Sequence, residues 1–109
     1  MTALGEGQVF QLNISAGGVP KRGVGRAMCR PLGLDGDDHD DKEEHGGPDR
    51  ALCLFALEHY LTLQREGHPA FPGSVGENIT LAGIDLGALA PGDRLTFGDD
   101  AEAVAIEIT

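Results

Sequence analysis

The stretch RALCLFALEHYLTLQREG (residues 50–67) joins an apolar run to a helical pattern and decides the fold class. Residues 51–57 are apolar without interruption, and periodicity alone does not separate a buried strand from a helix in such a run. We predict a buried strand over residues 50–55. The alternative is a single helix that begins at Asp49.

The second half of the stretch predicts the one convincing helix of the chain, over residues 56–66. Gly67 is a typical helix stop because glycine readily adopts the left-handed conformation that ends many helices, and Pro69 follows closely. Helical spacing is seen at Leu57, Tyr60, Leu61 and Gln64.

Short strands bounded by turn residues are predicted over the rest of the chain, at residues 7–13, 25–31, 78–82, 94–97 and 102–108. Pro91-Gly92-Asp93 is a tight-turn signature. In the last strand, Val104, Ile106 and Ile108 share one face. Together these elements predict a mainly β fold, a small mixed β-barrel with an accessory helix.

The composition limits the classes of partner. The 109 residues suffice for one domain, and 17 glycines suit a fold rich in turns. Eight lysines and arginines against 18 acids give a net charge of −10. This balance argues against nucleic acid or an anionic membrane as partner, although a local basic site for a small anionic ligand is compatible with it.

The two cysteines, Cys29 and Cys53, do not make a disulfide framework. With no membrane-spanning run and no signal peptide in the sequence, we expect a cytoplasmic protein with reduced thiols. Cys53 lies in the apolar run and is predicted to be a small buried hydrophobe. Cys29 is expected to pack in the core or at a sheet edge, rather than to be activated by Arg30.

Residues 35–44 include seven acids among ten positions and predict a solvated loop, because like charges repel each other. With His39 and His45 the segment leaves a zinc or calcium site open as an alternative. The spacing matches the ligand patterns of these metals only loosely, so we expect no dedicated metal site.

Five groups of residues follow one another in a characteristic order. They are Gly33-Leu34-Asp35-Gly36-Asp37; His45-Gly46-Gly47-Pro48-Asp49-Arg50-Ala51; Glu66-Gly67-His68-Pro69 with Phe71-Pro72-Gly73; Gly76-Glu77-Asn78 with Thr80-Leu81; and Leu89, Pro91-Gly92-Asp93 and Leu95. The ordered set, which covers most of the chain, resembles the MOSC domain family, named for the C-terminal part of molybdenum cofactor sulfurases. The small stand-alone bacterial members are the most similar.

The resemblance implies a mixed β-barrel that binds the molybdenum cofactor, a pterin with a phosphate and a dithiolene-held metal. It also implies a relation to sulfur carriers and sulfurases, or to oxidoreductases that reduce N-hydroxylated compounds. Family enzymes place a cysteine after a strand similar to residues 106–109, and neither Cys29 nor Cys53 matches it. Since a soft metal prefers a thiolate, we expect a domain that lacks its C-terminal part, with weak or no catalysis.

The matched motifs also imply the cofactor-binding residues. Gly46 and Gly47 can present N–H groups to a phosphate, and Arg50 is the best cation, with a surface ion pair as its alternative role. Glu77 and Asn78 can bind the polar edges of a pterin, with turn stabilisation as the alternative. The predicted set is His45, Gly46, Gly47, Asp49, Arg50, Gly76, Glu77, Asn78 and Asp37.

The resemblance raises two other roles. Family relatives are fused to a pyridoxal phosphate enzyme, whose Schiff base needs a lysine. The only lysines here are Lys21 and Lys42, both in predicted polar loops, so we expect no pyridoxal phosphate chemistry in this chain. The alternative to an enzyme is a non-catalytic cofactor-binding or carrier module, or an inactive fragment. Such a fragment is expected to form a homodimer through open strand edges.

Overall fold

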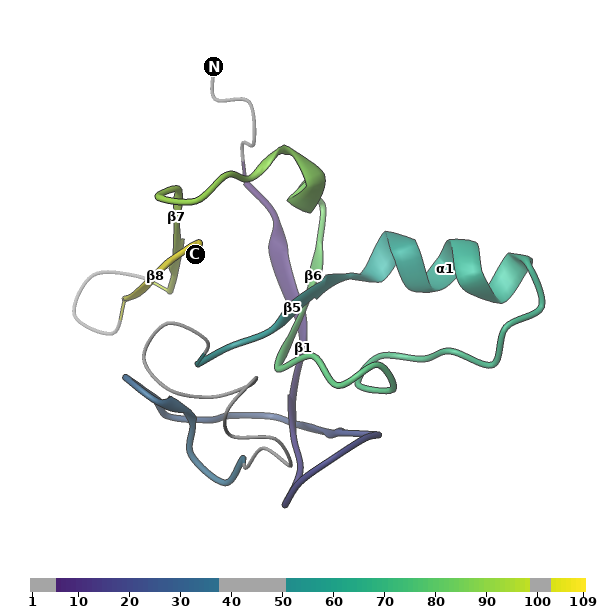
Figure 1. Ribbon diagram of the computed structural model, residues 1–109, viewed down its shortest axis with the longest axis horizontal. Helices are drawn as coiled ribbons and strands as arrows, with labels where there is room; N and C mark the ends of the chain where they lie inside the picture. Colours follow the sequence, from purple (N-terminus) through teal and green to yellow (C-terminus); the bar gives the residue numbers. More distant parts are fainter. Residues whose placement is uncertain (1–5, 38–50, 99–102) are drawn as a thin grey trace.

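The computed structural model describes residues 6–37, 51–98 and 103–109. Its centre is a four-stranded sheet of order β2-β1-β6-β5 (Figure 1). The strands are β1 (Gln8–Ile14), β2 (Arg22–Val24), β5 (Leu54–Ala56) and β6 (Ile79–Ala82). β1 is antiparallel to both of its neighbours, whereas β5 and β6 are parallel. A parallel pair needs a crossover connection, and this one contains the helix.

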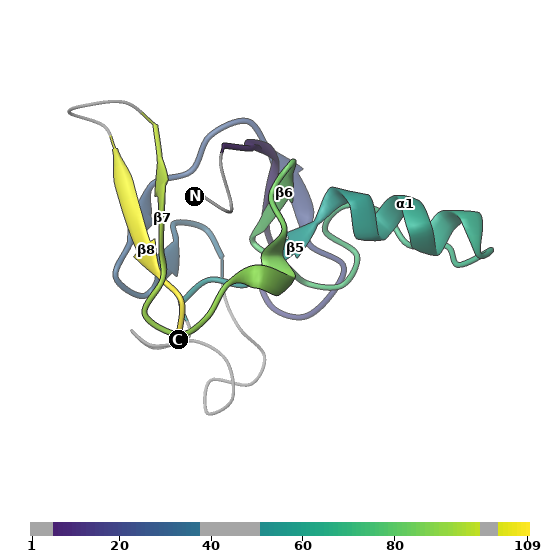
Figure 2. The ribbon, with the colours of Figure 1, turned by 90° about the horizontal axis from the view of Figure 1, so that it is seen from above.

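Two antiparallel hairpins accompany this sheet: β3 (Cys29–Arg30) with β4 (Gly33–Leu34), and β7 (Arg94–Phe97) with β8 (Val104–Glu107). A short 3-10 turn, η2 (Leu86–Ala88), precedes β7. Figure 2 shows the β7–β8 hairpin and the helix on opposite sides of the central sheet. The mainly β class is confirmed. Over the described ranges the three sheets are not hydrogen-bonded to one another, so a closed barrel stays a prediction.

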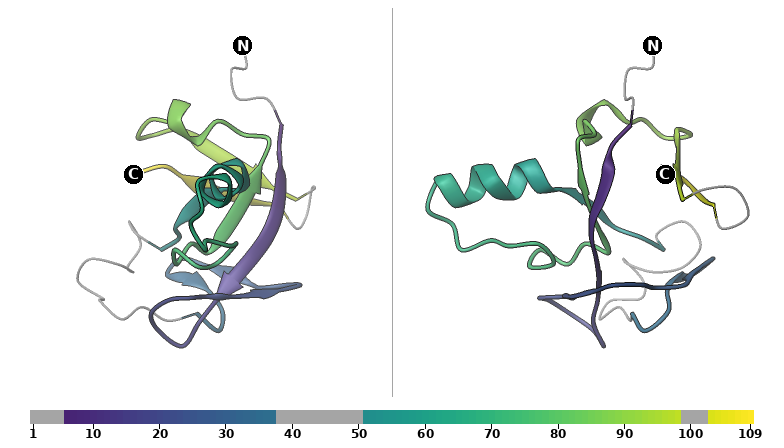
Figure 3. Two further views of the ribbon diagram at one scale, coloured as in Figure 1. Left: turned by 90° about the vertical axis from the view of Figure 1, so that its right-hand side faces the viewer. Right: turned by 180° about the vertical axis from the view of Figure 1, so that it is seen from behind.

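Helix α1 (Leu57–Arg65) follows β5 directly. Gly67 has φ +92°, and the N–H groups of Gly67 and His68 donate to the carbonyls of Gln64 and Leu63, each at 3.0 Å. This is a Schellman-type helix end, so the predicted glycine stop is confirmed. Seen end-on in Figure 3 (left), the helix lies in front of the central sheet. The alternative of one longer helix is wrong, because a strand precedes α1.

A bulge in β1 decides which side chains share a face of the central sheet. The register with β6 shifts between Val9 and Gln11, so Val9 and Leu12 lie on the same face although they are three positions apart. Their partners on β6 are Leu81 and Ile79, whereas Gln11 is paired with Thr80. The sheet therefore has one apolar face and one polar face.

The apolar face carries the core. Ile79, Leu81 and Leu95 are buried, and Phe97 and Ile106 of the hairpin pack against them. Burial alternates along β8, with Val104 and Ile106 more buried than their neighbours. This confirms the predicted apolar face of the last strand.

Two predicted strands differ from the observed ones. Within residues 25–31, where one strand was predicted, only Cys29–Arg30 form a strand, β3, which pairs with β4 in a separate hairpin. β2, which pairs with β1, ends at Val24 and was not predicted. The strand predicted over residues 50–55 begins at Leu54. One position earlier, the Cys53 N–H is bonded to the Asn78 side chain instead of to a strand partner. The other strands agree with their predicted bounds to within two residues.

Two side chains are placed differently from expectation. Cys53 is exposed, so the prediction of a buried hydrophobe is wrong. Strand β5, which was expected to bury Cys53, begins one residue later, at Leu54. Lys21 was predicted in a polar loop, but it is 7% exposed and lies among the polar residues described below. Its ammonium group has a buried acidic partner there, which sequence alone does not show.

Candidate functional site

Four of the nine sequence-predicted site residues lie in the described ranges: Asp37, Gly76, Glu77 and Asn78. The other five, His45, Gly46, Gly47, Asp49 and Arg50, lie outside them, as does most of the acidic segment, so these assignments stay predictions. The structure brings Asp37, Glu77 and Asn78 into one hydrogen-bonded group. We call this group the polar cluster; its members are Asn13, Lys21, Asp37, Tyr60, Glu77, Asn78 and Thr80.

Glu77 lies at the helix end of the polar cluster and has no exposed surface. Its Oε1 accepts a hydrogen bond from the Tyr60 hydroxyl at 2.6 Å. Its Oε2 accepts from the Thr80 hydroxyl at 2.8 Å and from the Gly73 N–H at 3.1 Å. Burial, followed by this hydrogen bond, raises the pKa of Tyr60 to about 12. The carboxyl group of Glu77 therefore connects helix α1, strand β6 and the loop that precedes β6.

Asn78 connects three segments of the chain. Its Nδ2 donates to Asp37 Oδ2 at 2.8 Å and to the Asn13 carbonyl at 3.4 Å. Its Oδ1 accepts from the Cys53 N–H at 3.0 Å, and its own N–H donates to the Cys53 carbonyl at 2.8 Å. Like Glu77, Asn78 is fully buried.

Asp37 is held by a buried ion pair. Its Oδ1 lies 2.7 Å from Lys21 Nζ, and the two side chains are 1% and 6% exposed. The same oxygen accepts from the Ser15 N–H at 2.9 Å. A buried carboxylate with a cation and further donors around it satisfies the condition under which charges are tolerated inside proteins.

Glycines shape the loop that leads into the polar cluster. Gly73 (φ +94°) and Gly76 (φ +97°) both have left-handed backbone conformations. A Cβ on Gly73 would collide with the Lys21 carbonyl, and the Gly73 carbonyl accepts from the Lys21 N–H at 2.8 Å. Gly73 therefore allows the loop to approach Lys21 closely.

Sequence reasoning did not assign Asn13, Lys21 or Tyr60 to the site, nor Thr80, which it had named only as part of a motif. Asn13 and Thr80 are fully buried, and Asn13 Nδ2 donates to Thr80 Oγ1 at 3.0 Å. The sequence did contain a signal for Asn13. Asparagine has a low strand propensity, and an asparagine inside a predicted strand needs a hydrogen-bond partner if it is buried.

Comparison with known proteins places the chain among related sequences. The sequence model of the MOSC domain matches residues 41–109. The chain belongs to the MOSC domain family. The match includes the motif from His45 to Arg50 as well as Glu77 and Asn78.

Relatives extend well beyond this chain. Protein YiiM of Escherichia coli (strain K12) is 40% identical over 83 residues, 69% of this chain and 35% of the relative. The uncharacterized protein YflK of Bacillus subtilis (strain 168) is 35% identical over 78 residues, 70% of this chain and 35% of the relative. The chain thus spans about a third of the length of these curated relatives.

One solved structure supports the same family fold. It is a crystal structure of a hypothetical protein, 34% identical, with a TM-score of 0.56 over 77% of this chain and 38% of that chain. In the part of this MOSC domain that the structure describes, no helix has the length and apolarity needed to cross a membrane.

The polar cluster offers little to a ligand directly. Among the described residues of this MOSC domain, every buried side-chain nitrogen and oxygen has a hydrogen-bond partner. In the same ranges, no three His, Cys, Asp or Glu side chains gather in a way that could hold a metal ion. The polar groups of these residues are engaged with other parts of the chain, and the assignment of Asp37, Gly76, Glu77 and Asn78 as cofactor-binding residues stays a prediction.

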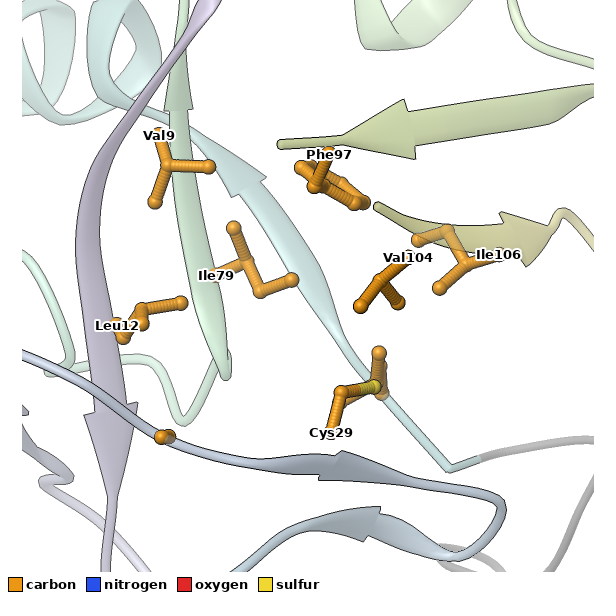
Figure 4. A pocket seen from close by; sticks show the side chains of 9 residues that line it. Val9, Leu12, Cys29, Ile79, Phe97, Val104 and Ile106 are labelled. Atoms are coloured by element: carbon orange, nitrogen blue, oxygen red, sulfur yellow. The ribbon is translucent and has the colours of Figure 1, made fainter. Parts of the chain in front are cut away.

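The other face of the sheet borders an apolar pocket of about 220 Å³ between the central sheet and the β7–β8 hairpin. Figure 4 shows Val9, Leu12 and Ile79 on the sheet side, with Phe97, Val104 and Ile106 on the hairpin side and Cys29 below. Partial burial raises the pKa of the Cys29 thiol. This agrees with the predicted packing role and gives no sign of an activated thiolate.

Cys53 is also no activated thiol, although it is exposed. Desolvation raises the pKa of its sulfur, the charge of Glu77 raises it further, and Lys21 lowers it. A thiol with a raised pKa is protonated at neutral pH and is a poor nucleophile or metal ligand.

Proposed function

We propose that this MOSC domain binds the molybdenum cofactor through the segment that contains His45, Gly46, Gly47, Asp49 and Arg50. Backbone N–H groups at the two glycines and a guanidinium fork suit a phosphate, and His45 and Asp49 suit the polar edges of a pterin. The cofactor, when bound, supplies a metal centre for redox or sulfur-transfer chemistry. Asp37, Gly76, Glu77 and Asn78 belong to the same site as its frame.

One observation supports this proposal above others. Asp37 and Asn78 come from separate motifs, 41 positions apart in sequence, and their side chains meet at 2.8 Å inside the chain. The residues by which the chain resembles MOSC domains thus converge, as parts of one site should. The family match includes the basic and glycine-rich motif between them in sequence.

The proposal is limited to binding. Sulfur transfer and the reduction of N-hydroxylated compounds are proposed only for longer proteins of which this domain is about a third. A non-catalytic binding or carrier module agrees best with the two cysteines, whose thiol pKa values are both raised.

The test is a fluorescence titration of the purified chain with the molybdenum cofactor under anaerobic conditions. Saturable binding is expected, and Arg50→Met should weaken it at least about tenfold, as the loss of a charge-assisted phosphate contact does. Arg30→Met is the matched control, because Arg30 is exposed and paired with Asp35 at 2.6 Å. A flat titration of the wild-type chain, or equal losses in both variants, would sink the proposal.

We also propose that copies of the chain associate through strand edges. Among residues 6–37, 51–98 and 103–109, β2 and β5 are the outer strands of the central sheet, and strands at a sheet edge readily pair with another strand. Size-exclusion chromatography with light scattering should show a mass that rises toward a dimer with concentration. A monomer at every concentration contradicts the proposal.

A further inference from the structure

We infer that two copies of this chain associate through β5, as an antiparallel pair of identical strands, and not through β2. The inference rests on the association through strand edges proposed above and assigns it to one of the two edges. It does not depend on whether the chain binds the cofactor.

The apolar run around β5 is not buried by the described part of the chain. Residues 51–57 are all apolar, and yet none of them is buried: Cys53 is exposed and the others are partly exposed. Leu52 and Leu54 contact the core with only part of their surface. A buried strand was predicted here, so apolar surface stays accessible where the sequence indicates burial. A contiguous apolar segment that is accessible at a sheet edge is typical of an association surface.

The outer side of β5 pairs with no described strand. The Cys53 carbonyl accepts from the Ile79 N–H at 3.2 Å, which shows the side of the chain that faces β6. Successive residues of a strand direct their N–H and C=O groups to opposite sides. The N–H and C=O groups of Leu54 and the N–H of Ala56 therefore point away from β6. Among the described residues, β6 is the only strand next to β5.

A second copy of the chain supplies matching groups for this outer side. With Leu54 at a two-fold axis, the Leu54 N–H of each copy donates to the Leu54 carbonyl of the other, as in a hydrogen-bonded pair of an antiparallel ladder. The Ala56 N–H of each copy then lies opposite the Leu52 carbonyl of the other. A contact of this kind uses the same surface on both copies and closes as a dimer.

β2 differs from β5 in the charge at its edge. Arg22 lies in β2 and Arg26 follows shortly after it, and both are exposed. In the ranges that the structure describes, neither forms an ion pair with a carboxylate. In a pair of identical β2 strands these guanidinium groups would repel each other, and charged side chains commonly protect edge strands from pairing. Residues 51–57 carry no charge, so β5 has no such protection.

The two edges predict opposite effects of salt on association. Each copy has a net charge of −10, so two copies repel each other, and pairing through the uncharged β5 forms no ion pairs that offset this repulsion. Added salt screens the repulsion and should strengthen a β5 dimer. A contact between Arg22 or Arg26 and carboxylates of a second copy should instead weaken as salt is added.

Spin labels locate the interface directly. In the Cys29→Ala variant the label is attached to the exposed Cys53, immediately before β5. Pairing centred on Leu54 places the two Cys53 Cα atoms about 8 Å apart, given a rise of about 3.3 Å per residue and a strand spacing of about 4.8 Å. Dipolar broadening of the label spectrum should therefore grow with protein concentration. The control is Gly25→Cys in a Cys29→Ala/Cys53→Ser chain, because a side chain at Gly25, just after β2, has open space around it. Its label should show no broadening.

A proline tests the backbone pairing. Ala56→Pro removes the outward N–H, and the φ of −88° at Ala56 is close to the range of proline, so the pairing with β6 should persist. The dissociation constant of the dimer, measured by sedimentation equilibrium, should rise at least about tenfold, because each copy loses one hydrogen bond to the other. Arg22→Ala at the β2 edge should change it by less than about twofold.

Each outcome supports or overturns the inference. Broadening at position 25 without broadening at Cys53, or a dimer that weakens as salt is added, means association through β2. That result overturns the inference and leaves the proposed association standing. A dimer without broadening at either label uses another surface and also overturns the inference. A monomer at every concentration overturns both. If Ala56→Pro does not fold, the two labels and the salt dependence still decide between the edges.

Discussion

The two faces of the central sheet are filled in different ways. On the helix side, the polar cluster joins β1, β6, α1 and two loops by hydrogen bonds between 2.6 and 3.4 Å, with Asn13, Glu77, Asn78 and Thr80 fully buried. On the hairpin side, the contacts are apolar and enclose a pocket of about 220 Å³. Figure 1 shows helix α1 on one side of β1 and β6 and the β7–β8 hairpin on the other.

The difference shows which region specifies geometry. Hydrogen bonds between buried groups are directional, and one missing partner is costly, so the polar cluster permits a single arrangement of its segments. Apolar contacts between the sheet and the hairpin are non-directional and tolerate a void. We therefore expect substitutions in the polar cluster to cost more free energy of unfolding than substitutions of similar size around the pocket.

The largest effect should come from Glu77→Ala. The change leaves the Tyr60 hydroxyl, the Thr80 hydroxyl and the Gly73 N–H without their acceptor in a region closed to water. The free energy of unfolding should fall by about 4 kcal/mol, measured by urea denaturation. Glu66→Ala, at an exposed carboxyl just after the helix, should change it by less than about 0.5 kcal/mol. Similar losses in both variants would mean that the buried hydrogen bonds of Glu77 do not stabilise the fold more than an exposed carboxyl does.

The second effect concerns two glycines with nearly the same backbone conformation. Gly73→Ala should cost about 3 kcal/mol, because a left-handed φ and a collision with the Lys21 carbonyl add together. Gly67 has a φ of +92°, but a Cβ at this position would have open space around it. Gly67→Ala should therefore lower the free energy of unfolding by about 1 kcal/mol. Thermal unfolding of both variants measures the difference. Equal losses would mean that backbone strain alone, and not the approach to Lys21, requires Gly73.

Much of the fold was predictable because local signals agreed with the tertiary structure. The strand-to-helix change after residue 56, the stop at Gly67 and the β7–β8 hairpin each depend on neighbouring residues. The error over residues 25–31 has another origin. The bounds of β2 and β3 depend on the strands with which they pair, β1 and β4, and the residues of β2 and β3 do not by themselves indicate these partners.

The motif resemblance selected Asp37, Glu77 and Asn78, and the structure joins these three residues in the polar cluster. Their assignment to a cofactor site stays a prediction. Their roles depend on partners outside the motifs, such as Lys21 and Tyr60, whose burial follows from the assembled sheet and helix. For the same reason Cys53 was misplaced, since its exposure depends on where β5 begins.

The third prediction uses Tyr60, the single tyrosine of a chain without tryptophan. The fold raises its pKa from about 10 to about 12, so the fold favours the protonated hydroxyl. This contribution is complete below pH 10 and is lost as pH rises from about 10 to about 12, by on the order of 2 kcal/mol. Tyrosinate absorbance reports Tyr60 alone and should titrate well above its usual range. Tyr60→Phe should lack this alkaline loss of stability, and a midpoint near 10 in the folded chain would contradict the buried bond to Glu77.

The smallest effect should be a gain, on the apolar side. Ala27 lines the pocket, and Ala27→Leu adds apolar volume where about 220 Å³ is unfilled, so the free energy of unfolding should rise by about 1 kcal/mol. Ala105→Leu makes the same change on the exposed face of β8 and should leave stability nearly unchanged. The contrast follows from packing, because only the first leucine gains neighbours on several sides. If Ala27→Leu instead lowers the free energy of unfolding, as overpacking of a rigid core does, the hairpin is held rigidly against the sheet. The apolar face would then be as specific in its geometry as the polar face, and the proposed difference between them would disappear.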